Sequence, residues 1–541
     1  MCLIARNEER FLGACLKSIQ GLNAQIIVVD TGSTDRTVEI ARDFGAEVYS
    51  FTWSDDFAAA RNAALEHARG DWVLMLDADE ELPKDQHAAL MGDIAQAKVL
   101  GYRLPLVNIE HEAHGRSHVP RLFRNMPGIF YTGRIHEQIF PSLMPHTKAW
   151  GLDLAIGTAQ ITHHGYTRQM MVDRDKIQRN LKLLQLAVSE NPMDVNLMMN
   201  LGLEWVRSGD LAAGVDQYRK AFHLMTAGRE DETAPELREV LLTQFTSHLY
   251  KMRHHEEVVE VLNSKLVQRG GLTASLHFAM GLAHFELKQF AEAAAQMQQC
   301  IRKRGEKSLA PVNTDIHTTA PEHCLALSLA RKGDAEASEK CFLEVLGRTQ
   351  PQSGALAEIK LDYARFLTNQ NRGVEAFHKL HELVAANSKH LAAWQFGAEA
   401  ALTRPEFLEF GRDWTTEAVK YAGEDFTLHH HRAEILMLLG ENATAAVIWE
   451  RLWSSERQPG ILAALILCEL INGKVNHAPG HGADEPSTSR AFIKWYQKLI
   501  SMKSFKVVAR VNESLSSLQG VLPNAAAMLQ KALEECQPAS R

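Results

Sequence analysis

Two aspartates one residue apart are the first candidates for chemistry in this sequence. Trp72 to Leu76 is a continuous apolar run of strand length, and Asp77 and Asp79 follow it directly, with Ala78 between them. Carboxylates are costly to bury in an interior, whereas open α/β sheets bind ligands at the carboxyl ends of their strands. At such an edge the pair could hold a divalent cation against phosphate oxygens. The plainer alternative is an acid that merely marks a strand-to-loop transition.

A third acid, Asp30, ends another apolar strand. The β-branched run before it, residues 25–29, is typical of a strand buried on both faces. Gly32 lies in the turn that follows, whose free backbone N–H groups favour a phosphate or a polar ring edge. The turn matches neither GxGxxG nor a Walker loop. Acids at the ends of two neighbouring strands favour a nucleotide pocket, although Asp30 could also be a simple turn residue.

The elements that must position these acids alternate between strand and helix. Strands are expected at residues 1–5, 25–29, 48–51 and 72–76. Helices are expected between them, and Ser33 and Ser54 are suitable N-caps for two of these helices. Strand–helix alternation at this pace predicts βα units and a mostly parallel sheet.

Length and composition limit the classes of protein that this sequence could form. A chain of 541 residues needs more than one core. The formal net charge of −8 argues against nucleic acid as a partner. The seven cysteines form no CxxC pair, which argues against a zinc ribbon and a secreted disulfide framework. We expect no integral membrane segment and no signal peptide, because no apolar run is long enough and charges follow Met1 closely. A cytoplasmic location is therefore expected.

Seven motifs, in order, resemble those of family 2 glycosyltransferases of the GT-A fold. They are Ala5-Arg-Asn-Glu-Glu9, Ile27-Val-Val-Asp-Thr-Gly-Ser-Thr-Asp35, Ala59-Ala-Arg-Asn62, Leu76-Asp-Ala-Asp-Glu80, Arg121-Leu-Phe-Arg124, Gly133-Arg-Ile-His-Glu-Gln138 and Ile161-Thr-His-His-Gly-Tyr166. The last three resemble a branch that fuses the transferase to tetratricopeptide repeats and includes S-glycosyltransferases of bacteriocin peptides. The resemblance covers roughly residues 1–225 and implies a GT-A-type α/β domain that binds a nucleotide sugar.

The resemblance also implies roles for individual residues. The implied nucleotide-sugar ligands are Ala5, Arg6, Asn7, Glu8, Asp30, Gly32, Arg61, Asp77 and Ala78. Asp30 would bond the base, Asp77 would touch the ribose, and Asp79 would ligate Mg²⁺ or Mn²⁺ between the two phosphates. Such a cation would stabilise the departing nucleoside diphosphate. Arg61 has an alternative, which is an ion pair with Asp55 or Asp56 at the start of its own helix.

The acceptor side follows from the same resemblance. Family 2 enzymes usually carry an acidic general base at a helix start, and Glu137 stands where it is expected, with His136 as the alternative. His163 resembles a late histidine that completes the metal shell. Arg121, Arg124 and Arg134 are candidates for diphosphate or acceptor contacts, or else belong to a solvated surface.

From residue 174 the strand signals end and helical repeats begin. Leu201-Gly202, Trp205, Gly209, Tyr218 and Ala221 fit a tetratricopeptide unit, and more degenerate copies follow. Such helix pairs stack into a solenoid whose concave face commonly takes a peptide or a protein segment. The predicted divisions are 1–173 for the transferase domain, 174–471 for the repeats, 472–490 for a linker or mobile loop, and 491–541 for C-terminal helices.

These observations predict a metal-dependent, inverting hexosyltransferase that uses a UDP-linked sugar, with the repeats recruiting a protein or peptide acceptor. A first alternative is a catalytically retired transferase domain on a repeat scaffold, which the altered base motif and the short first strand make conceivable. A second is a nucleotidyltransferase, but Arg6-Asn7-Glu8 is not the Gly-rich basic loop that such an enzyme needs.

Overall fold

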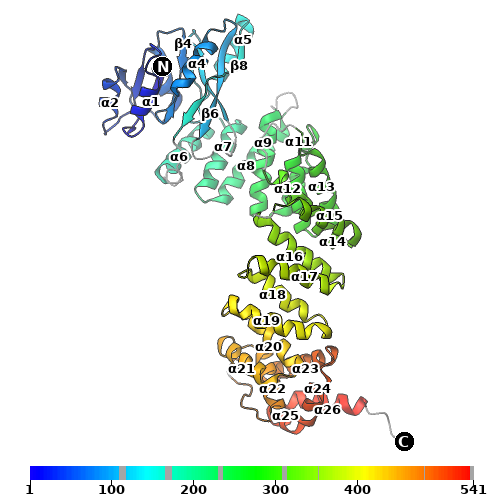
Figure 1. Ribbon diagram of the computed structural model, residues 1–541. Helices are drawn as coiled ribbons and strands as arrows, with labels where there is room; N and C mark the ends of the chain where they lie inside the picture. The colour runs from blue at the N-terminus through cyan, green and yellow to red at the C-terminus, as the bar shows by residue number, and fades with distance from the viewer. Residues whose placement is uncertain are drawn as a thin grey trace. The chain divides into compact units, whose positions relative to one another are not determined.

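The structure, a computed structural model, describes residues 1–108, 117–164, 174–228, 235–306, 314–350, 353–480 and 482–536. The described residues form two compact units, one up to Leu272 and one from Thr273 onward. The first unit combines an α/β domain with the first helices of the helical region (Figure 1). Within the described residues, no helix is both long and apolar enough to span a bilayer.

The four predicted strands are all present. They are β1 (Cys2–Ala5), β2 (Ile27–Asp30), β3 (Glu47–Ser50) and β4 (Trp72–Leu74). β1 pairs in parallel with β2, and β2 in parallel with β3. An isolated parallel bridge between Cys2 and Met75 places β4 on the other side of β1. β1 therefore lies between β2, which ends at Asp30, and β4, which comes just before Asp77. The prediction that the two acids follow neighbouring strands was wrong.

Beyond β4 the sheet is mixed, so the prediction of a mostly parallel sheet was wrong for this half. The remaining strands are β5 (Glu80–Glu81), β6 (Val99–Asn108), β7 (Ser117–Arg124), β8 (Asp153–Ile156) and β9 (Ile161–His163). β7 lies antiparallel between β4 and β6, β6 pairs in parallel with β8 and β9, and β5 pairs antiparallel with β9. The chain from β6 to β7 is too short for the crossover of a dozen or more residues that a parallel pair requires.

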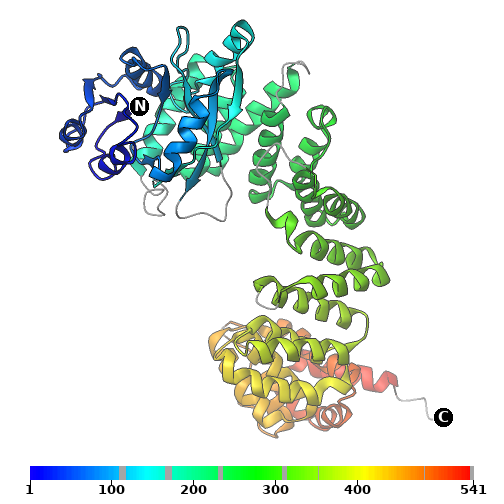
Figure 2. The same ribbon diagram turned by 45° about the horizontal axis from the view of Figure 1, so that its top comes forward.

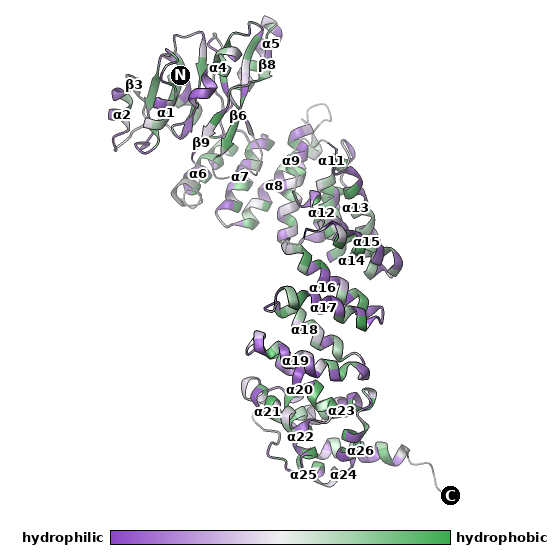
Figure 3. Ribbon diagram, in the orientation of Figure 1, coloured by the Kyte–Doolittle hydropathy of each residue, from purple (hydrophilic) through white to green (hydrophobic). Residues whose placement is uncertain are grey.

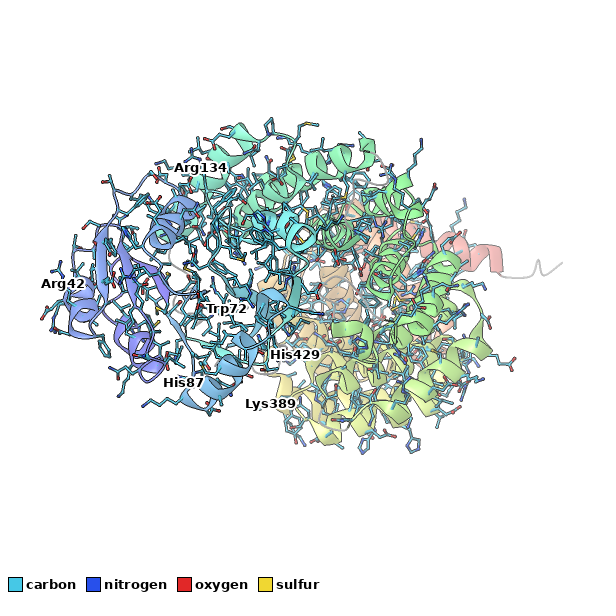
Figure 4. The ribbon with its side chains drawn as sticks, turned by 90° about the horizontal axis from the view of Figure 1, so that it is seen from above. Arg42, Trp72, His87, Arg134, Lys389 and His429 are labelled. Atoms are coloured by element: carbon cyan, nitrogen blue, oxygen red, sulfur yellow. The ribbon has the colours of Figure 1, made fainter. Side chains whose placement is uncertain are left out.

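Both faces of the parallel strands are covered, which explains their unbroken apolar runs. Leu3 and Val28 belong to one core, whereas Cys2, Ile27 and Val29 belong to the core on the opposite face. The helices of the domain are α1 (Leu12–Ser18), α2 (Thr37–Asp43), α3 (Phe57–Glu66), α4 (His87–Ile94) and α5 (Phe140–Trp150), with a short 3₁₀ turn, η1 (Lys84–Gln86), before α4. Figure 3 shows hydrophobic residues along β6 of this domain, and Trp72 of β4 is labelled in Figure 4.

The predicted helix caps were wrong: the N-cap of α2 is Arg36, without a side-chain cap bond, and the N-cap of α3 is Asp56. Asp35 accepts the N–H of Thr37 at 3.0 Å where α2 begins, while the Ser33 hydroxyl accepts the N–H of Asn7 at 3.0 Å. At α3, Asp56 accepts the N–H of Ala59 at 2.9 Å. Ser33 is thereby free to tie the first loop to the turn after β2.

From Arg174 on, the described residues are mostly helical and form antiparallel hairpins (Figure 2). The helices of the first unit are α6 (Arg174–Glu190), α7 (Val195–Arg207), α8 (Leu211–Ala227), α9 (Pro235–Lys251), α10 (His255–Leu262) and α11 (Lys265–Gln268). Gly202 and Tyr218 meet between α7 and α8, as a tetratricopeptide unit requires: a Cβ on Gly202 would lie 3.0 Å from the Tyr218 ring. The predicted fold class, an α/β domain followed by an all-α helical solenoid, is confirmed.

The second unit continues the hairpins. Its helices are α12 (Ala274–Glu286), α13 (Phe290–Lys303), η5 (Thr314–His317), α14 (Ala320–Lys332), α15 (Ala335–Arg348), α16 (Gly354–Asn369), α17 (Gly373–Ala386), α18 (Leu391–Ala401), η6 (Pro405–Phe407), α19 (Leu408–Ala422), α20 (Phe426–Leu439), α21 (Asn442–Ser455), α22 (Pro459–Ile471), α23 (Glu485–Ser501), α24 (Phe505–Glu513), α25 (Leu515–Val521) and α26 (Pro523–Cys536). The linker predicted at 472–490 is shorter than expected, because Asp484 accepts the N–H of Ser487 at 2.8 Å and caps α23.

Candidate active site

A cavity of about 390 Å³ lies at the carboxyl ends of β1 and β4. Its volume is within the usual range for ligand pockets. The residues that line it are Ile4, Ala5, Arg6, Glu8, Thr31, Trp53, Phe57, Arg61, Asp77, Ala78, Asp79, Ile135, His136, Glu137, His163, Arg179 and Asn180. Most of the residues singled out from the sequence therefore share one cavity, although they come from five separate segments of the chain.

Asp77 and Asp79 lie in a tight turn directly after β4. The N–H of Glu80 donates to the carbonyl of Asp77 at 3.0 Å, and the Glu80 carboxylate accepts the N–H of Asp77 at 3.0 Å. The Asp79 carbonyl accepts the N–H of His164 at 2.9 Å. These bonds fix the backbone of the turn, so the two aspartate side chains leave it in a defined direction.

Arg61 forms ion pairs with two carboxylates, Asp77 and Glu137, which were predicted to have separate roles. Its Nη2 lies 2.6 Å from Asp77 Oδ1 and its Nε lies 2.6 Å from Glu137 Oε1, and the residue is only 4% exposed. Burial alone would lower the pKa of Arg61, but Asp77 and Glu137 raise that pKa far above its ordinary value. The alternative pairing at its own helix start is not formed, since Asp55 pairs with Lys182 at 2.9 Å and Asp56 caps α3.

Arg121 of β7 completes this buried cluster of charges. Its Nη2 donates to Asp77 and, at 2.7 Å, to Glu80. Burial would raise the pKa of Asp77, but Arg121 and Arg61 outweigh it and hold that pKa well below its ordinary value. For Glu80, burial and the charge of Asp77 prevail and raise the pKa. Asp77 is thus held as an anion between two guanidinium groups.

Arg124 and Arg134 point to other partners. Arg124 donates to the carbonyls of Val99 at 2.8 Å and of Gln96 and Ala97 at 3.1 Å, and its guanidinium lies over the Trp72 ring. Arg134 pairs with Glu190 of α6 at 2.8 Å. Neither lines the cavity, so the structure gives no support to the diphosphate or acceptor contacts considered for them.

Asp79 and His163 form the part of the cavity suited to a cation. Asp79 Oδ2 and His163 Nε2 are 3.3 Å apart and both side chains line the cavity. Burial opposes the charged imidazole, but the hydrogen bond and charge of Asp79 outweigh it and raise the pKa of His163. With ligand distances of about 2.1 Å, both donors could reach one Mg²⁺ or Mn²⁺. Within the described ranges no group of three or more such ligands occurs, so phosphate oxygens and water would have to complete the shell.

The loop that carries His136 and Glu137 lies at the cavity rim. His136 has φ of +55°, a left-handed backbone that is uncommon outside glycine. Its residue is exposed overall, yet the surrounding protein desolvates the ring and lowers its pKa, which favours the neutral form. The Glu137 side chain is only 13% exposed because it reaches inward to Arg61. Both predicted candidates for the base therefore line the same cavity.

The first loop of the chain borders the cavity as the resemblance implied, with one exception. Ala5, Arg6 and Glu8 line it, whereas Asn7 does not. Asn7 has φ of +57°, and its side-chain oxygen accepts the N–H of Thr34 at 2.8 Å. Asn7 therefore joins the first loop to the turn after β2.

Asp30 stands level with Ala5 at the end of the sheet but does not line the cavity. Its carboxylate accepts the N–H groups of Gly32 at 3.2 Å and Ser33 at 3.1 Å, and the residue is buried. Gly32 has φ of +105°, so the turn needs a glycine there. Thr31 lines the cavity between them. The implied contact of Asp30 with a base stays a prediction.

One wall of the cavity was not foreseen from the sequence. Arg179 and Asn180 of α6 line it together with Trp53 and Phe57. A hydrophobic cluster lies beneath this wall and contains Ile135, Leu181, Leu184 and Leu201, with Trp53 and Phe57 packed against it. The first helices of the helical region are thus part of the site. No sequence signal marks Arg179 and Asn180, which read as ordinary residues of an amphipathic helix.

The site and fold together define a class: a ligand-binding α/β domain, with acids at one edge, joined to helical hairpins. Comparison with known proteins agrees. The family described as "Glycosyl transferase family 2" matches residues 1–153. Residues 1–153 thus match a glycosyltransferase family 2 domain, and the chain continues into helical hairpins.

Curated relatives resemble part of the chain. A TPR repeat-containing protein of Synechococcus elongatus is 36% identical over 216 residues, which is 39% of this chain and 53% of the relative. The SPbeta prophage-derived glycosyltransferase SunS of Bacillus subtilis is 29% identical over 211 residues, 37% of this chain and 48% of the relative. The chain therefore spans about half the length of these relatives.

Solved structures of tetratricopeptide repeat proteins resemble part of the chain. YrrB, described as a TPR protein with an unusual peptide-binding site, is 15% identical with a TM-score of 0.30, covering 39% of this chain and 95% of that one. A tetratricopeptide repeat protein from Parabacteroides merdae is 13% identical with a TM-score of 0.36, covering 51% and 98%. Scores this low carry no information about function.

Proposed function

We propose that this protein transfers a sugar from a nucleotide sugar, most simply a UDP-sugar, to a protein or peptide acceptor, with Mg²⁺ or Mn²⁺ and inversion at the anomeric carbon. The observation that carries the proposal is the shared cavity: Asp77, Asp79, Glu137 and His163 all line one cavity of about 390 Å³. Residues 1–153, which hold the first three of these, match glycosyltransferase family 2. A hexose as the transferred sugar is part of the proposal.

The nucleotide end of the cavity is the side of Asp79 and His163. These two residues would hold the cation, and Ala5, Arg6, Glu8 and Thr31 are the nearest candidates for the nucleoside. A divalent cation, when bound there, would neutralise charge on the diphosphate leaving group. The turn around Asp79 is fixed by backbone hydrogen bonds, so little ordering is needed on binding.

We assign the acceptor to the part of the cavity that Glu137 and His136 line. Glu137 would take the proton from the acceptor nucleophile as that atom bonds to the anomeric carbon, and the bond to the diphosphate oxygen breaks on the opposite face. The guanidinium of Arg61 holds the Glu137 carboxylate toward the cavity at 2.6 Å. His136 would serve in the same role if the acceptor approaches from the rim.

The helical repeats would bring the acceptor to this end. Helices α6 and α7 belong to the same compact unit as the α/β domain, and α6 contributes Arg179 and Asn180 to the cavity wall. A peptide bound beside α6 would therefore lie next to this wall of the cavity. The proposal keeps the expected cytoplasmic location.

Calorimetry with a panel of nucleoside diphosphates and UDP-sugars, with Mn²⁺ or with EDTA, tests the donor. Binding that needs Mn²⁺ and is lost in Asp79→Ala supports the proposal. Absence of binding by every nucleotide, or equal binding by Asp79→Ala, contradicts it and favours a retired transferase domain on a repeat scaffold. Incubation of radiolabelled UDP-sugars with fractionated host lysate then identifies the acceptor fraction.

A further inference from the structure

Arg121 touches the acids of the site without facing the cavity. It lies on β7, where its carbonyl accepts the N–H of Met75 at 2.8 Å, just before the turn that carries Asp77 and Asp79. Its side chain is 14% exposed, and it is not among the residues that line the cavity. A bound nucleotide would therefore meet Asp77 and not Arg121.

Its single Nη2 atom joins both ends of the turn. It donates to Asp77 at the start and, at 2.7 Å, to Glu80 at the end. Glu80 also accepts the backbone N–H of Asp77 at 3.0 Å, and its side chain is only 2% exposed. Asp79 lies between Asp77 and Glu80 in the turn. The orientation of its side chain therefore depends on the clamp, which is the pair of hydrogen bonds from Arg121 to Asp77 and Glu80.

A series of ion pairs connects the clamp, through Asp77, to Glu137 on the other part of the cavity lining. One oxygen of Asp77 binds Arg121 and the other binds Arg61, which in turn binds Glu137. Three carboxylates and two guanidinium groups thus form a continuous chain of ion pairs from Glu80 to Glu137. Removing one guanidinium from such a buried chain leaves carboxylates without compensation, and they must rearrange.

We propose that Arg121 is a positioning residue, which sets the geometry of the nucleotide-binding turn and, through Asp77 and Arg61, of Glu137. The inference rests on the proposed function. It assigns to Arg121 an effect on nucleotide affinity that is transmitted through Glu80 and Asp77, with no direct contact. Arg124, three residues along the same strand, provides a matched control, because its guanidinium binds backbone carbonyls away from the cavity.

The test measures Mn²⁺-dependent binding of UDP to the full chain by calorimetry, together with the electron paramagnetic resonance spectrum of the bound Mn²⁺. The variants are Arg121→Gln, Arg121→Lys and Arg124→Gln. We expect Arg121→Gln to weaken UDP binding about tenfold or more and to alter the Mn²⁺ spectrum. Arg121→Lys should recover part of the affinity, because a lysine keeps the charge but not the fork geometry. Arg124→Gln should bind UDP as the parent does.

A double-mutant cycle with Glu80→Gln tests whether Arg121 acts through Glu80, using variants whose thermal melts show that they are folded. If Arg121 acts through the clamp, Glu80→Gln combined with Arg121→Gln costs less affinity than the sum of the single changes. Strict additivity overturns the inference, as does parent-like UDP affinity in Arg121→Gln or equal loss in Arg124→Gln. A parent chain that binds no nucleoside diphosphate overturns the proposed function and this inference together, an outcome distinct from the others.

Discussion

The Nε atom of Arg61 lies 2.6 Å from the carboxylate of Glu137, although 76 residues separate them in the chain. The same guanidinium binds Asp77. One buried side chain therefore connects the turn proposed to bind the nucleotide with the residue proposed as the base. The two halves of the proposed reaction are held at a fixed separation by the protein itself.

Replacing Arg61 tests this connection through stability. Arg61→Ala leaves Asp77 and Glu137 buried without one of their counter-charges, which should lower the free energy of unfolding by about 3–5 kcal/mol. Urea unfolding at pH 7 measures the loss. Arg36→Ala, which breaks an exposed pair with Glu39, serves as the control and should be indistinguishable from the parent. A parent-like unfolding curve for Arg61→Ala would show that the buried pairs are not formed in solution.

Asp79 and His163 should matter for binding and little for folding. Asp79→Asn should weaken Mn²⁺-dependent UDP binding by roughly 100-fold, because it removes a direct ligand, and His163→Ala should have a smaller effect in the same direction. Both variants should melt close to the parent temperature, since the Asp79 side chain is 28% exposed. Asp85→Asn, at an exposed acid a few residues away, should bind UDP normally. Calorimetry and thermal melting on the same samples distinguish the two effects.

Acid should destabilise the first compact unit through His248. Burial, with a smaller contribution from Lys251, lowers the pKa of His248 to about 4, and its ring packs beside Tyr218. Between pH 6.5 and 4 the unfolded chain binds a proton that the folded chain does not, so stability falls as the pH falls. At pH 5 the loss should be about 2 kcal/mol.

His248→Phe should remove this contribution while keeping an aromatic ring in place. Urea midpoints at pH 7.5 and pH 5 give the comparison, and His254→Asn, at an exposed histidine in the same unit, should behave like the parent. The assignment fails if His248→Phe shows the full pH dependence of the parent.

The close approach of α7 and α8 should not tolerate a methyl group. A Cβ on Gly214 would lie 2.7 Å from the carbonyl oxygen of Gly202 and 2.6 Å from Val206. Gly214→Ala should therefore destabilise the hairpin by about 1–3 kcal/mol. At Gly92, in α4, a Cβ meets nothing within 4 Å, so Gly92→Ala should stabilise by about 0.5–1 kcal/mol. Opposite shifts in thermal melting are expected, and equal shifts would contradict the packing.

The first unit should fold only when α6 and α7 are included. A fragment of residues 1–272 contains the hydrophobic cluster around Ile135, Leu184 and Leu201, whereas a fragment of residues 1–173 exposes Ile135, Trp53 and Phe57. We expect the longer fragment to be soluble and to bind UDP with Mn²⁺, and the shorter one to aggregate. Size-exclusion chromatography and calorimetry check both points. A soluble, UDP-binding 1–173 fragment would show that the α6 wall is dispensable.

The sequence by itself determined the local elements and the kind of domain. The apolar runs at 1–5, 25–29, 48–51 and 72–76 form strands because alternate side chains are buried on both faces of the sheet. The Gly202 and Tyr218 pattern gives a helix hairpin because a small residue permits the contact that a large one fills. Both features depend on residues close together in the chain.

Only the tertiary structure decided which distant residues meet. No local pattern shows the bond of Asp35 to Thr37, the Asp56 cap of α3, the pairing of Arg61 with Glu137, the contacts of Arg121 with Asp77 and Glu80, or the wall from α6. The sequence also offers nearby ion-pair partners that are not used, such as Asp55 for Arg61. Burial in the folded domain decides which ion pair forms. A guanidinium group buried in a low-dielectric interior must form ion pairs with carboxylates that lie next to it in the folded domain. Which carboxylates lie there depends on the packing of the whole domain.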